Sequence, residues 1–99
     1  MALHIEPEDD RVIIKIDGAF SINEVTEAQI GLGDAFAMKK DLMLDLSGVT
    51  DCDTAGIQLI VSAKKKAMEM HVRFFVESVS NSVQEAFGRI GMTLGKTEA

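Results

Sequence analysis

The sequence has a single cysteine, no long apolar run and few basic residues, and each shortage excludes a class of protein. Cys52 cannot form an internal disulfide, which fits a reducing compartment, and its apolar character favours burial over a reactive thiol. No apolar stretch reaches the roughly 18 residues that span a bilayer, and the N-terminus lacks a basic segment followed by an apolar one. We therefore expect a soluble, cytoplasmic protein that does not insert into a membrane.

Basic residues are outnumbered, ten against 16 acidic ones, so the formal net charge is -6. Nucleic acids and anionic lipids are bound through clustered Lys and Arg, so neither is expected as a partner. What the sequence does have is 46% hydrophobic residues in a chain of 99, which is enough for one modest core. The prediction is a single domain over residues 1–99.

The stretch from Leu42 to Gly56, LMLDLSGVTDCDTAG, organises the prediction for the rest of the chain. Its apolar start, residues 42–46, is typical of a strand buried on both faces, and the turn-forming residues 45–48 are expected to end that strand. Helical spacing begins again near Ala55, so Asp51, Asp53 and Thr54 are predicted to lie in a loop before a helix. A hydroxyl beside two carboxylates at such a point is typical of helix capping or of a modification site.

Alternating or β-branched patterns predict further strands on both sides of this stretch. Residues 3–6 read as an edge strand that ends at Pro7, and residues 11–16 read as a strand that forms a hairpin with it. Residues 72–76 are rich in strand formers. Strands that alternate with helices after an opening hairpin predict an α/β layer fold with a mixed sheet.

Helix signals fall between these strands. Ser21 and Glu24 have the spacing of a capping box, which predicts a helix from near Ile22 with one apolar stripe facing the core. Ser80, Asn81 or Ser82 can cap a last helix that is expected to end at Gly91. The apolar positions in that helix are Val83, Ala86, Phe87 and Ile90.

The helix predicted over residues 54–70 carries two apolar lines. The broader one is expected to face the core and contains Gly56, Leu59, Ile60, Ala63, Ala67 and Met70. The thinner one contains Ile57, Val61 and Met68, and a partly exposed line of this kind indicates either a contact surface or packing against a neighbouring element.

Catalytic and metal-binding motifs fit the sequence poorly. Asp51 and Asp53 after a strand suggest a D-x-D-x-T phosphatase, but Thr54 comes one residue early and the carboxylates stand too far from the strand. A calcium loop starting at Asp51 fails because Ala55 and Ser62 replace oxygen ligands. We therefore expect no enzyme activity, no metal and no cofactor.

The segments Asp45-Leu46-Ser47-Gly48 and Asp53-Thr54-Ala55-Gly56 resemble the signature of STAS domains, the family of bacterial anti-sigma factor antagonists and of related transporter domains. The resemblance extends over nearly the whole chain. It implies a STAS-like mixed β-sheet of four to five strands, with helices packed mainly on one face. It also implies a phosphorylatable hydroxyl at the start of the second main helix, which by position is Thr54.

In this family the resemblance implies a non-catalytic interaction switch. The expected partner is an anti-sigma factor or related serine/threonine kinase, together with a cognate phosphatase, and phosphorylation of the antagonist releases the complex. The expected partner-binding residues are Asp51, Asp53, Thr54, Ala55, Gly56, Ile57, Gln58 and Val61.

A second hypothesis rests on Ala55, because many phosphorylated antagonists have a serine after the acceptor residue. Asp53-Thr54-Ala55-Gly56 also resembles the small STAS subunits of lipid-transport ABC systems. The alternative is therefore a constitutive subunit that binds its ATPase through the same helix without phosphorylation.

Overall fold

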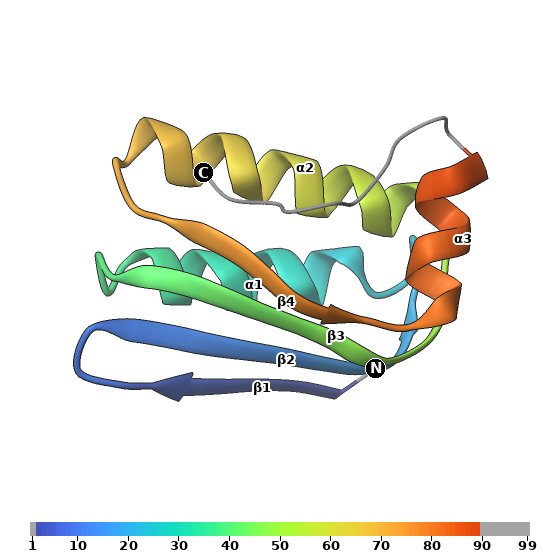
Figure 1. Ribbon diagram of the computed structural model, residues 1–99, viewed down its shortest axis with the longest axis horizontal. Coiled ribbons are helices and arrows are strands. Elements are labelled where there is room, and N and C mark those ends of the chain that lie inside the picture. The colour runs from blue at the N-terminus through green and yellow to red at the C-terminus, as the bar shows by residue number, and fades with distance from the viewer. Residues whose placement is uncertain (1, 90–99) are drawn as a thin grey trace.

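The computed structural model describes residues 2–89, which form four strands and three helices (Figure 1). In chain order they are β1 (Ala2–Pro7), β2 (Arg11–Phe20), α1 (Val25–Phe36), β3 (Asp41–Cys52), α2 (Thr54–Glu69), β4 (Phe74–Val79) and α3 (Asn81–Arg89). No helix within residues 2–89 is long and apolar enough to cross a bilayer.

The sheet has the strand order β1-β2-β3-β4, with β1 antiparallel to β2 and the other pairs parallel. The connection from β2 to β3 and the connection from β3 to β4 advance in the same direction across the sheet. Connections between parallel strands are almost always right-handed. The connecting helices α1 and α2 therefore cover the same face, where they pack against each other, while α3 lies at the end where α2 begins (Figure 1). The predicted α/β fold with a mixed sheet and helices mainly on one face is confirmed.

The core lies between this covered face and the two helices. Alternate residues of the central strands are completely or almost completely buried there: Val12, Ile14, Ile16, Leu42, Leu44 and Leu46. Their neighbours on the opposite face, Ile13, Met43 and Phe75, are only half-buried. The prediction that residues 42–46 are buried on both faces is therefore wrong, because the helices cover one face and Met43 points to the other.

β3 also runs further than predicted. Residues 45–48 do not end the strand but form an irregularity, in which the Asp45 carboxylate accepts hydrogen bonds from Ser47 Oγ at 2.7 Å and Ser47 N at 2.9 Å. These two bonds lower the pKa of Asp45. The pairing then resumes because β2 continues through Gly18, at a φ of 87°, and aligns Phe20 with Cys52. Asp51 consequently belongs to the strand rather than to a loop.

The start of α1 differs from the predicted capping box. Ser21 Oγ donates to the Glu24 carboxylate instead of accepting from an amide, and residues 21–24 form a turn. Glu24 stands at the N-cap without a side-chain cap bond, so the helix begins at Val25 and not near Ile22.

The C-terminal elements shift by a few residues from their predicted positions. α2 is followed by a reversal at His71, where φ is 59°, and β4 therefore begins at Phe74 rather than at residue 72. Ser80 is the residue that caps α3, because Val83 N donates to its Oγ at 3.4 Å. The predicted end of this helix at Gly91 lies outside the described residues.

α3 covers a strand edge that β4 leaves unpaired. β4 pairs with β3 only as far as Leu46, while β3 continues to Cys52 alongside β2. Beyond that point Ser82 Oγ donates to the carbonyl oxygen of Thr50 at 2.8 Å, and Arg89 Nη2 donates to that of Cys52 at 3.1 Å. Two side chains of α3 thus donate hydrogen bonds to carbonyl groups at this part of the β3 edge, where β4 is absent.

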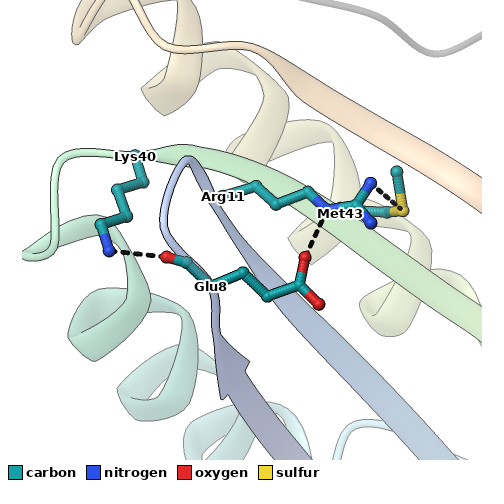
Figure 2. A network of polar contacts seen from close by, with 4 residues as sticks. All are labelled: Glu8, Arg11, Lys40 and Met43. Atoms are coloured by element: carbon teal, nitrogen blue, oxygen red, sulfur yellow. Dashed lines mark hydrogen bonds and ion pairs between the residues drawn. The ribbon is translucent and has the colours of Figure 1, made fainter.

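The opposite end of the sheet is held by the network in Figure 2. Arg11 Nε donates to Glu8 Oε1 at 2.8 Å, and Arg11 Nη1 lies 3.7 Å from Met43 Sδ. Lys40 Nζ donates to the main-chain oxygen of Glu8 at 2.6 Å. These contacts fasten the β1–β2 turn to the start of β3.

Candidate functional site

The junction between β3 and α2 is organised by the carboxylate of Asp53. Oδ1 accepts from Gly56 N at 3.1 Å, which makes Asp53 the N-cap of α2, and Oδ2 accepts from Ile22 N at 3.0 Å. The main-chain N–H of Asp53 donates to the carbonyl of Phe20 at 3.4 Å. One residue therefore joins the end of β2, the turn before α1 and the first turn of α2.

Thr54 is the first residue of α2, and it is exposed. The sequence left two candidates for the cap, and the structure assigns that role to Asp53. The Thr54 hydroxyl is thus not required to hold the helix terminus, and it is accessible from solvent. Asp51, at the end of β3, is also exposed.

Two of the predicted contact residues turn inward. Gly56 is buried against β2, so that a Cβ placed on it would lie 2.6 Å from the carbonyl oxygen of Phe20 and 3.2 Å from Cys52 Sγ. The Ile57 side chain is 0% exposed. Ile57 therefore packs inside the protein, which is the second of the two alternatives that the sequence allowed for this apolar line, and it is not available to a partner.

The predicted residues Thr54, Ala55, Gln58 and Val61 form an outward surface on the first turns of α2. Gln58 is exposed, and Ala55 and Val61 are half-buried. Ser62, which was not among the predicted contact residues, is exposed one turn after Gln58. We call Thr54, Ala55, Gln58, Val61 and Ser62 the neutral strip, since none of them carries a charge. The centres of protein interfaces are likewise depleted in charged residues.

Ile22 is a surface residue of this region that sequence reasoning missed. It lies in the turn before α1, its main-chain N–H bonds to Asp53, and its side chain is 70% exposed. The sequence signal was misleading, because Ile22 stands three residues before Val25 and so continues the apolar spacing of the helix core.

Cys52 is buried, at 3% exposure, as predicted. Burial, reinforced by the nearby charge of Asp53, raises the pKa of its thiol to about 11. The thiol is therefore protonated at neutral pH and is a poor nucleophile or metal ligand.

Other chemical groupings lie away from this junction. Residues 2–89 contain no cluster of three or more His, Cys, Asp or Glu residues that could hold a metal ion. A hollow of about 240 Å³ lies at the opposite end of the sheet and is lined by Asp10, Arg11, Asp41, Leu42, Met43 and Phe75.

The two bonds of the Asp53 carboxylate can be separated by substitution. We expect Asp53→Ala to lower the free energy of unfolding by about 2 kcal/mol, since it removes both the cap and the acceptor for Ile22 N. Asp53→Asn keeps an oxygen for Gly56 N but places an NH₂ group before Ile22 N, so its loss should be about half as large. Urea denaturation measures both, and equal losses for the two variants would contradict the bridging role.

A protein-family model described as "Mlab, STAS domain" matches residues 3–94 of the chain. Among solved structures, an anti-sigma factor antagonist from Mycobacterium paratuberculosis superposes with a TM-score of 0.79 at 16% identity, covering 91% of this chain and 77% of that protein. The anti-sigma factor antagonist SpoIIAA in its unphosphorylated form gives a TM-score of 0.75 at 16% identity, with 92% and 82% covered. At these identities the likeness establishes the fold.

Mglu is similar in one part only. One of its crystal structures matches with a TM-score of 0.68 at 26% identity and covers 75% of this chain, but the match spans 19% of Mglu. The same fold thus also occurs as a small part of a much longer protein.

Proposed function

This chain belongs to the STAS domain family, and from that premise we propose that it is an anti-sigma factor antagonist. In this proposal it is a non-catalytic switch that binds an anti-sigma factor with serine/threonine kinase activity and is released by phosphorylation at Thr54. The observation that supports it most is the exposed Thr54 hydroxyl, which stands at the start of the neutral strip and is not needed as the helix cap.

Phosphorylation would change this surface strongly. A phosphate adds about -1.5 to -2 charge at neutral pH, and here it would stand beside Asp51 and Asp53. A partner packed on the neutral strip would have to remove that charge from water at the contact, which costs free energy. Release of the partner is the expected consequence.

The second candidate function is a constitutive subunit of a lipid-transport ABC complex, which binds its ATPase through the same strip. Ala55 is the observation that favours it, because a small apolar residue follows the hydroxyl where many phosphorylated antagonists have a second serine. In this case the partner would stay bound in the presence of ATP.

Intact-mass measurement separates the two functions. We expect incubation with purified anti-sigma factor kinases of the source organism and Mg-ATP to add one phosphoryl group to the wild-type protein and none to Thr54→Ala. Thr50→Ala is the matched control, because Thr50 is also exposed but lies on β3, and it should be modified like the wild type. An unmodified wild type would favour the constitutive subunit, and a modified Thr54→Ala would place the phosphate elsewhere.

A further inference from the structure

Ile22 is a large apolar residue on the surface, and it stands on a turn whose main chain is anchored. It is 70% exposed, although the main chain around it is anchored by the bond from Ile22 N to Asp53 and by the bond from Glu24 N to the carbonyl of Ser21 at 2.9 Å. Because the main chain of this turn is already ordered, a partner that binds Ile22 does not have to order it. The carboxylate that caps α2 therefore also holds the main chain of Ile22 beside Asp53, the residue that precedes Thr54.

The charged residues near Ile22 and Thr54 in the sequence are acidic, and Arg89 of α3 is a basic residue that reaches this junction, through its bond to the carbonyl of Cys52. Residues 17–37 and 47–63, which include the turn before α1 and the neutral strip, contain no Lys, Arg or His. Their acidic residues are Asp17, Glu24, Glu27, Asp34, Asp51 and Asp53. The basic residues of α2 come only afterwards, at Lys64, Lys65 and Lys66.

Charge is therefore unevenly distributed over the surface around Thr54. Acidic groups lie on the Ile22 side, the neutral strip runs along α2, and lysines follow toward the C-terminal end of the helix. A partner matches this order only with basic groups at one end of its own surface.

We propose that Ile22 is the apolar anchor of the partner contact, inserted into an apolar pocket that the partner borders with Lys and Arg side chains. This inference rests on the proposed function, since the partner is the kinase released by phosphorylation at Thr54. The basic border faces Glu24 and Asp51, and the neutral strip packs beside it. Buried apolar anchors at the centre of a contact carry most of the binding energy, while charges at its border mainly speed association.

The test measures binding of the unphosphorylated protein to the purified kinase that modifies Thr54. Ile22→Ala should weaken the affinity at least about tenfold, as expected for an anchor residue. Ile30→Ala is the matched control, because Ile30 is 63% exposed but lies farther along α1, and its affinity should remain within about twofold of the wild type. Both side chains are largely exposed, so thermal melting should show the same stability for both variants.

The basic border is tested by association kinetics with the same kinase. Raising the salt concentration and replacing Asp51 by Asn should both lower the association rate constant, with a smaller effect on dissociation. Wild-type affinity in Ile22→Ala, equal loss in Ile30→Ala, or a salt-independent association rate would overturn this inference alone. A wild-type protein that binds no kinase would instead overturn the proposed function itself.

Discussion

Replacing Gly56 by valine is expected to lower the free energy of unfolding by about 3 kcal/mol, at the upper end of the range for overpacked cores. The reason is the contact between α2 and β2, where even a Cβ atom would lie 2.6 Å from the carbonyl oxygen of Phe20. That oxygen belongs to the main chain of a paired strand, so it cannot rotate away as a flexible side chain would. Relief requires moving the helix off the sheet.

Urea denaturation measures this loss, and α1 supplies the control. Gly33 is also a helical glycine, but a Cβ placed on it would meet nothing within 4 Å. Gly33→Ala should therefore keep or raise the stability, by up to about 1 kcal/mol from helix propensity alone. An unchanged denaturation midpoint for Gly56→Val would mean that the close approach of α2 to Phe20 is absent in solution.

The second large effect concerns binding and not stability. We expect Thr54→Glu to weaken binding of the proposed kinase partner about 100-fold, because it places a permanent charge on the neutral strip. Thr54→Ala should bind like the wild type and resist release by ATP. Both variants should unfold within about 0.5 kcal/mol of the wild type, since Asp53 provides the cap and a carboxylate is favourable near a helix N-terminus.

A third variant separates charge from size. Thr54→Gln has nearly the shape of Thr54→Glu without its charge, so it should bind much more tightly than Thr54→Glu if charge causes the release. Calorimetric titration with the kinase gives all three affinities. Equal weakening by Gln and Glu would show that the contact excludes bulk at this position rather than charge.

The fold was predictable from the sequence because the local patterns agree with the layered arrangement. The alternation in residues 11–16, the helical spacing after Thr54 and the strand formers near Phe74 each lead to the observed element. The length of β3 was not predictable, because Ser47 and Gly48 are turn formers by themselves. They stay in the strand because β2, distant in sequence, supplies pairing partners as far as Cys52.

For the candidate site, the sequence located the junction but not the direction of its side chains. The cap could have been Asp53 or Thr54, and only the packing of α2 on the sheet assigns it to Asp53 and turns Ile57 inward. The exposure of Ile22 was not predictable either, since its spacing in the sequence fits the core face of α1. Its exposure follows from the tertiary bond to Asp53, which no local pattern records.

The edge of β3 that β4 leaves unpaired bears on the risk of aggregation. An open strand edge is a template on which a strand from another chain can add, and such addition leads to aggregation. Here Ser82 and Arg89 occupy the carbonyl groups of Thr50 and Cys52, immediately before the residues that lead to Thr54. α3 therefore covers a strand edge that lies beside the contact surface. If α3 detached, the carbonyl groups next to Thr54 would be free to pair with a strand of another chain, which would favour polymers over specific complexes.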